Sequence, residues 1–336
     1  MPRRLMVFNK TYGGGYKAMN ITTLLLDMKG AVSQGMLWSI MTLGVYISFR
    51  LLDYADLSVD GTFATGGAVT AVLVSKGMDP YLSLVFALLA GLACGAVTGI
   101  LNTKLKIPSL LAGILTMIAL YSVNLHIMDG KANIPFLGTD TIATKAAALL
   151  PGGDKVIAGM VIGLVFAAAV IAFMYWFFGT ETGSVIRATG NNEYMARAFG
   201  VNTDTMVILG LMISNGFVSL SGAMVAQCQG YADVGMGIGT VVIGLASVII
   251  GEVIMGDRFN FAYKLVAVVV GSIIYRMIIA LVLFLGLKSY DLKLFTAIIV
   301  AAALAIPVAV NKFSSKKSIA EPDVSDTDGG RSPSDV

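Results

Sequence analysis

The sequence is short of charged residues for its length. Only 13% of the 336 residues are charged, 57% are hydrophobic, and the mean hydropathy is +0.83. A chain of this composition is an integral membrane protein with several spans, and it leaves little room for a soluble catalytic domain. The net charge of +3 is small, and no nucleic acid partner is expected.

Histidine and cysteine are also scarce. His126 is the only histidine, which excludes histidine-rich metal sites and histidine relays. Cys94 and Cys228 lie in or beside apolar runs without CxxC spacing, so we interpret them as small apolar residues. The motifs GxxxxGK[ST], HExxH and GxSxG are absent. We therefore expect no enzyme active site, metal or cofactor in this chain.

Long apolar runs are what the sequence does contain, and nine of them are candidate membrane spans. They are Ala31–Leu51, Val59–Val74, Leu82–Leu101, Leu110–Ile127, Val156–Phe178, Thr205–Ala226, Thr240–Ile254, Phe261–Leu285 and Leu294–Val310. The second contains Asp60 and a glycine pair, and the seventh is short. Such spans indicate broken or re-entrant helices near a transport path. A tilted ordinary helix with close glycine packing explains them equally well.

Three regions are expected along the chain: an extension or interfacial segment over residues 1–29, a transmembrane domain over 30–311, and a disordered tail over 312–336. Lysines place the tail in the cytoplasm. Counting back through the spans then places residues 179–204 inside and 128–154 outside. Nine spans leave the basic N-terminus outside, which conflicts with the same rule and suggests that one element is miscounted.

A polar segment, Gly179–Asp204, separates two of the long apolar runs. Within it we predict a short helix over Asn192–Phe199, with N-cap chemistry from Gly190, Asn191 and Asn192 and a stop at Gly200.

This predicted helix is amphipathic. Glu193 and Arg197 are four residues apart and should pair, while Met195 and Phe199 form a small apolar face. A short amphipathic helix in a solvent loop is expected to bind a partner.

A few ionisable residues fall within or near the spans, where charge is costly. Asp60 is either part of a transport path or, together with Asp56, a cap at the start of a helix at the cytoplasmic surface, and the sequence favours the cap. Glu252 should lie near the cytoplasmic end of its span. Arg276 falls mid-span and needs a carboxylate or carbonyl partner.

The polar segment and the span after it resemble the permease subunits of ABC importers for branched-chain amino acids, ribose and nucleosides. The matching residues are Arg187, Ala188, Gly190, Asn191, Asn192, Ala196, Ala198, Gly200, Val201 and Asn202, followed by Ser221, Gly222 and Ala223. The earlier stretch LDYADLSVDGTFATGGAVTA resembles the segment that leads into the family's second span. The resemblance covers about Ala31 to Val310 and is greatest to single-permease systems for aromatic or other hydrophobic amino acids.

The resemblance implies an all-α, type II-like importer permease with about eight to ten transmembrane helices, some of them broken, in the bacterial cytoplasmic membrane. Its implied partners are two cytoplasmic ATPase subunits, which carry the ATP and Mg, an extracytoplasmic substrate-binding protein, and a second permease copy in a homodimer. The residues implied to couple to the ATPase are Asn191, Asn192, Glu193, Met195, Arg197, Phe199 and Gly200. Candidate residues of the translocation path are Asp60, Thr62, Asn215, Ser219 and Glu252.

Two alternatives stay open at this stage. An ion-coupled secondary transporter or a channel also has broken spans and intramembrane carboxylates. Within the importer class, the substrate is either an amino acid or a sugar or nucleoside.

Overall fold

The structure is a computed structural model, and it describes residues 21–150, 153–255, 260–284, 294–301 and 305. Its elements in chain order are α1 (Ile21–Tyr46), the π-helical turn η1 (Ile47–Leu51), α2 (Ser58–Ser75), α3 (Pro80–Thr103), α4 (Ser109–Ile127), β1 (Asn133–Pro135), α5 (Ile142–Leu149), α6 (Lys155–Phe178), α7 (Glu181–Asn191), α8 (Glu193–Ala198), α9 (Thr203–Gln229), β2 (Tyr231–Asp233), α10 (Thr240–Met255) and α11 (Phe261–Phe284). Residues 294–301 are also helical. The predicted tail, most of the predicted extension and about half of the last predicted span lie outside the described residues.

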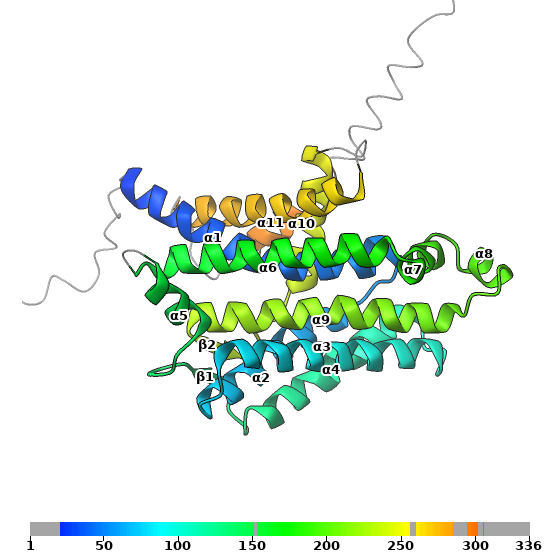
Figure 1. Cartoon of the computed structure of the whole chain (residues 1–336), viewed down its shortest axis with the longest axis horizontal. Coiled ribbons are helices and arrows are strands. Elements are labelled where there is room, and N and C mark those ends of the chain that lie inside the picture. The colour runs from blue at the N-terminus through cyan, green and yellow to red at the C-terminus, as the bar shows by residue number, and fades with distance from the viewer. Residues whose placement is uncertain (1–20, 151–152, 256–259, 285–293, 302–304, 306–336) are drawn as a thin grey trace, which may run out of the picture.

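The long helices run side by side, so the molecule has two distinct ends (Figure 1). One end carries α7 and α8, and we call it the α8 end. The other, the α5 end, carries α5 and the antiparallel pair β1–β2, in which Ile134 lies opposite Ala232. The start of α1 also lies at the α5 end, where the Lys29 ammonium pairs with the Asp154 carboxylate at 2.8 Å. The described N-terminal end is therefore opposite to α7 and α8, as the nine predicted spans require.

Six of the described helices are long and apolar enough to cross a membrane, and α10 is a shorter apolar helix. The predicted all-α polytopic fold is confirmed. Helix α1 extends beyond the first predicted span, because it is already helical from Ile21. Asp27 and Lys29 interrupt the apolar run at this point, and the pairing of Lys29 with Asp154 lets the helix continue through them.

Helix α9 lies at the centre of the bundle and packs against α1, α2 and α3. Glycines at positions 91, 95 and 99 line one face of α3 at a spacing of four. A Cβ at Gly95 would collide with the carbonyl oxygen of Leu211 on α9, and one at Gly99 would lie 2.9 Å from the Cα of Ile208. These glycines allow the two backbones to approach closely, which is the usual way of packing helices in a membrane.

The two marginal spans are helices that begin inside the bundle. The Asp56 carboxylate, just before α2, accepts a hydrogen bond at 2.7 Å from the amide of Asn215, which lies halfway along α9. Helix α10 begins beside Asp60 in the first turn of α2, whose carboxylate bonds Thr240. The starts of α2 and α10 therefore meet near the middle of the bundle. This arrangement favours the broken-helix interpretation of both segments over a tilted ordinary helix.

Candidate functional site

The polar segment predicted to hold one short helix holds two. Helix α7 occupies Glu181–Asn191, where no helix was predicted, and α8 occupies Glu193–Ala198. The α8 prediction was accurate: the Asn192 side chain caps the helix by accepting from the Met195 N–H at 2.9 Å, and Gly200 ends it with a φ of +83°. Gly190 and Asn191 belong to the end of α7 and do not cap α8, which corrects that part of the prediction.

Charged side chains fix α8 to the start of α9. The predicted pair forms, with the Arg197 guanidinium 2.6 Å from the Glu193 carboxylate. Arg197 also donates to the Thr203 hydroxyl at 2.8 Å and lies 3.6 Å from the Asp204 carboxylate. Asp204 in turn lies 3.7 Å from Lys106 in the loop between α3 and α4. Helix α8 is therefore bonded to the start of α9, and the start of α9 is in turn attracted to the neighbouring loop.

The outer face of α8 is apolar and open. Tyr194 is 84% exposed, Phe199 80% and Met195 46%, whereas Ala196 on the opposite side is buried. We call Tyr194, Met195 and Phe199 the α8 patch. Sequence reasoning identified Met195 and Phe199 through their spacing of four and missed Tyr194, which lies off that stripe. Large exposed apolar residues on a helix fixed by ion pairs are typical of a docking surface.

Helix α7 joins the α8 region to other elements at the same end. A Cβ at Gly190 would collide with the carbonyl oxygen of Leu51, so α7 packs directly on η1. The Arg187 guanidinium stacks on the ring of Phe261, the first residue of α11, at 5.1 Å from its centroid. Through α7 and α8, this end of the molecule contacts η1, α9 and α11.

Asp60 caps α10 rather than its own helix. One carboxylate oxygen accepts from the Gly239 N–H at 2.9 Å, and the other accepts from the Thr240 hydroxyl at 2.8 Å and the Val241 N–H at 2.9 Å. A carboxylate in this position satisfies orphan donors of the helix and opposes its dipole. The favoured prediction made Asp60 a cap of the helix that its own segment begins, and this was wrong: the carboxylate caps a helix 180 residues away in sequence.

Asp56 caps α2, but inside the bundle. Its side chain accepts from the Ser58 N–H at 2.9 Å, as the capping prediction required. The predicted location at the cytoplasmic surface was wrong, because Asp56 is fully buried and bonds Asn215 on α9. A charge or polar cluster at this depth needs such partners, since water does not reach it.

The remaining path candidates are not gathered into one site within the described part of the chain. Asn215, Thr62 and Ser219 are fully buried at helix contacts, and the Ser219 hydroxyl donates to the Ala87 carbonyl of α3 at 2.6 Å. Glu252 lies on α10 and pairs with Arg50 in η1. Neither residue of that pair is deeply buried. These contacts tie helices together, and a path role for the five residues stays a prediction.

The arrangement defines a multi-pass helical membrane protein whose α8 end bears a short helix, ion-paired to the start of α9, with an apolar outer face. Among the described residues, no three His, Cys, Asp or Glu side chains cluster as metal ligands would.

Comparison with known proteins identifies the family. Residues 28–306 match the model of the branched-chain amino acid transport system permease component. A tyrosine transport system permease protein of Clostridioides difficile is 41% identical over 281 residues, which cover 83% of this chain and 91% of the relative. The ribose import permease protein of Escherichia coli (strain K12) is 25% identical over 275 residues, 80% of this chain and 81% of the relative. A solved structure described as a metal-chelate type ABC transporter in an inward-facing conformation aligns with a TM-score of 0.46 at 15% identity, covering 85% of this chain and 86% of that one.

The chain belongs to the branched-chain amino acid transport system permease family of ABC transporters. The family resemblance inferred from the polar segment is confirmed. As a permease component it is a multi-pass protein of the cytoplasmic membrane, as predicted, and the family lacks an ATPase domain of its own.

Proposed function

We propose that this chain is the permease of a binding-protein-dependent importer of amino acids with aromatic or other hydrophobic side chains. Two separate ATPase subunits dock on the α8 end of a permease homodimer, which is then its cytoplasmic end. The α8 patch carries this proposal, since an exposed apolar face on a helix tied to α9 suits a groove on a partner. The 41% identity to a tyrosine transport permease, against 25% for a ribose permease, supports an amino-acid substrate over a sugar.

The contacts of α8 suggest how the energy of ATP enters the permease. ATP and Mg belong to the ATPase, whose closure moves the bound α8 as a rigid body. The ion pairs of Arg197 and Asp204 pass the movement to α9 and to the loop between α3 and α4. The ATPase shifts the permease only as far as it binds the inward and outward states differently. The proposed coupling residues are Asn191, Asn192, Glu193, Met195, Arg197, Phe199 and Gly200, and we add Tyr194 because it is exposed beside Met195.

Co-purification with a candidate ATPase subunit from the same organism tests the docking surface. Phe199→Asp and Met195→Asp place a charge on the α8 patch and should each abolish co-purification, while the permease still inserts and elutes as wild type. Leu137→Asp is the matched control, because Leu137 is 86% exposed at the opposite end. An ATPase that binds and couples normally to both α8 variants contradicts the proposal.

The ion-coupled transporter is the alternative, and the surroundings of the intramembrane carboxylates weigh against it. Asp60 accepts three hydrogen bonds and Glu252 is ion-paired, so neither is a vacant proton or cation carrier. Uptake by the purified chain alone in liposomes, driven by an ion gradient and abolished by Glu252→Gln, would establish the alternative. The importer instead requires the ATPase and the binding protein for uptake. Competition for labelled tyrosine uptake by phenylalanine, but not by ribose, tests the substrate class.

A further inference from the structure

The segment between β2 and α10, residues 234–239, is a run of tight turns. The N–H groups of Met236, Ile238 and Thr240 each donate to the carbonyl three residues earlier, at 3.1 Å. Gly239, at the end of the run, has a φ of +89°, and a Cβ placed there would meet no atom of the described residues within 4 Å. The backbone is therefore irregular here, and open space lies beside its last residue.

This run of turns enters the bundle from the α5 end and stops near its middle. A Cβ at Gly67 would lie 2.6 Å from the Met236 sulfur, and one at Gly237 would collide with the Asp60 carbonyl oxygen, so the run follows α2 towards its start. At the end of the run, the Gly239 N–H donates to the Asp60 carboxylate at 2.9 Å. Because α2 begins near the middle of the bundle, the turns end between the two membrane surfaces.

The surface around the end of the run is exposed and carries a carboxylate. Ile238 is 67% exposed, and Val242, four residues later in α10, is 41% exposed. Asp60, which bonds Gly239 between them in sequence, is partly exposed. We call Asp60, Ile238, Gly239 and Val242 the mid-bundle surface. It combines irregular backbone, apolar side chains and an acidic residue at one depth.

Lipid is an unsuitable neighbour for the mid-bundle surface. Within the hydrocarbon region, irregular backbone occurs only where protein covers it or where it lines a water-filled cavity. Ionisable side chains at that depth likewise face the interior of a bundle or water. Interrupted helices that begin near the midplane are typical of transport paths. The mid-bundle surface is therefore expected to face water or a second protein chain.

Arg276, the other charged residue predicted at mid-span, gives no comparable surface. Its guanidinium stacks on the ring of Trp38 in α1, 3.7 Å from the centroid. Its one hydrogen bond printed among the described residues is long, 3.4 Å to the Gln34 side-chain oxygen, and its Nε and Nη2 atoms are buried. No carboxylate in the described part of the chain pairs with it. The charge of Arg276 is therefore directed towards α1.

We propose that the mid-bundle surface lines the water-filled transport path, and that Ile238 is a residue that the cargo passes. The second permease copy of the proposed homodimer closes the path on the other side. Apolar side chains such as Ile238 and Val242 make weak contacts with a hydrophobic cargo, which suits passage rather than retention. The inference rests on the proposed function for the cargo and the second copy. Contact of Ile238 with water can be measured on the permease without ATPase or binding protein.

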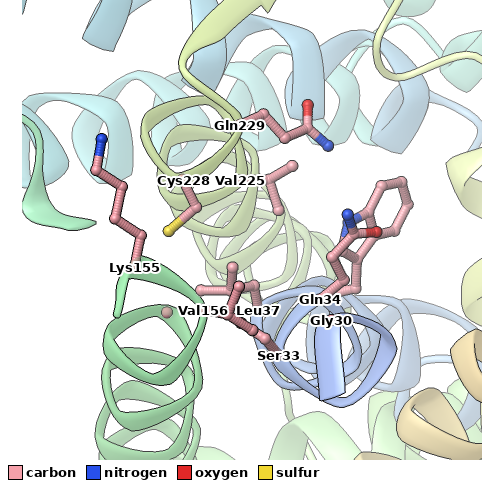
Figure 2. Close-up of a pocket in the computed structure, with 11 residues that line it drawn as sticks. Gly30, Ser33, Gln34, Leu37, Lys155, Val156, Val225, Cys228 and Gln229 are labelled. Atoms are coloured by element: carbon pink, nitrogen blue, oxygen red, sulfur yellow. The ribbon is translucent and has the colours of Figure 1, made fainter. Parts of the chain in front are cut away.

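Cysteine modification distinguishes water from lipid and from protein at Ile238. Cys94 is buried, and Cys228 lines a pocket of about 180 Å³ where α1, α6 and α9 come together (Figure 2), so both are first replaced by alanine. Ile238→Cys is then made in the full-length permease, reconstituted in nanodiscs and treated with a charged methanethiosulfonate. The thiolate is the reacting species, and it forms in contact with water, so the rate of modification reports hydration.

Two further cysteine variants calibrate this rate. Val165 is β-branched, 59% exposed and near the middle of the continuous helix α6, so Val165→Cys represents a side chain that faces lipid. Leu137 is 86% exposed at the α5 end, so Leu137→Cys represents a side chain in water. Ile238→Cys should react roughly tenfold faster than Val165→Cys and approach the rate of Leu137→Cys. If Ile238→Cys does not fold, Val242→Cys replaces it with the same expectation.

Uptake by the complete importer tests whether this water belongs to the path. Modification of Ile238→Cys before reconstitution with ATPase and binding protein should reduce labelled tyrosine uptake at least tenfold. Reduction of the mixed disulfide with dithiothreitol should restore it. The cysteine-free parent, treated with the same reagent, should keep its uptake.

Three results would overturn the inference. A rate equal to that of Val165→Cys would mean that Ile238 faces lipid. Unreactive Ile238→Cys copies that an oxidant cross-links to each other would make the surface a contact between copies. Full uptake after complete modification would separate the water from the path. A wild-type importer that takes up no tyrosine would instead contradict the proposed function, while the modification rates on the permease alone still decide whether this surface is in water.

Discussion

Replacing Asp60 by asparagine should loosen the start of α10. The carboxylate accepts three hydrogen bonds there, two on one oxygen and one on the other. Asparagine keeps one oxygen for Thr240 and Val241, but its amide nitrogen then faces the Gly239 N–H, donor against donor. One hydrogen bond to a charged group, worth about 1.5–3 kcal/mol, is lost. Loss of the charge at the helix N-terminus adds roughly 0.5–1 kcal/mol.

The expected destabilisation is therefore about 2–4 kcal/mol, which corresponds to a fall in Tm of roughly 5–15 °C for a unit of this size. Thermal unfolding of the purified protein in nanodiscs measures it. Hydrogen exchange locates it, since the amides of Gly239 and Val241 should exchange faster while those of α4 do not change.

Asp79→Asn is the matched control for this change. Asp79 caps α3 at the exposed α5 end, and one of its oxygens accepts from both the Tyr81 and Leu82 N–H groups, so asparagine can keep both bonds. It gives up an ion pair with Lys145, and exposed pairs contribute little to stability. Its Tm should change far less than that of Asp60→Asn. Equal Tm values and equal protection of Val241 in wild type and Asp60→Asn would refute the capping argument.

Two further predictions concern packing and pH. Gly95→Leu places a side chain where α3 and α9 touch, so it should prevent folded protein from accumulating in the membrane. Fluorescence-detected gel filtration measures this accumulation. Gly30→Ala is the control and should have no such effect, because Gly30 is a helical glycine with open space around it. The bonded Lys29 ammonium holds the pKa of Asp154 below its usual range, so the pair stabilises the fold at neutral pH and is lost as the pH falls through that lowered pKa. Unfolding midpoints of wild type and Asp154→Asn should converge in acid, and a constant difference across pH would contradict this assignment.

Apart from the first, the long spans could be predicted from the sequence to within about three residues. The predicted Leu110–Ile127 is α4 from Ser109 to Ile127, and the predicted Val156–Phe178 is α6 from Lys155 to Phe178. Apolar runs match helices here because the membrane sets a length of about 20 residues and leaves no other structure open to the backbone. Helices α5 and α7 were missed because they are short and lie outside the apolar runs, although the Thr141–Thr144 capping box could have signalled α5.

The candidate site was predictable where its contacts are local. The cap, pair and stop of α8 all fall within nine residues, from Asn192 to Gly200, and each follows from side-chain chemistry at fixed spacing. The partners of Asp60 and Arg276 were not predictable, because they lie 180 and more than 230 residues away in sequence. The lack of a carboxylate for Arg276 could be recognised only after α1 and α11 had been placed side by side.

A carboxylate caps the start of both α2 and α10, but the two caps differ in strength. Each begins in the middle of the bundle, where the positive end of a helix dipole would be costly without a carboxylate, and Asp56 and Asp60 supply one each. Asp56 is fully buried and bonded to Asn215, whereas Asp60 is partly exposed. Hydrogen bonds to a charge are stronger and their loss costlier where water is excluded. The hydrogen bonds of Asp56 at the start of α2 are therefore the costlier to break. The hydrogen bonds of Asp60 at the start of α10 can be broken at a lower free-energy cost.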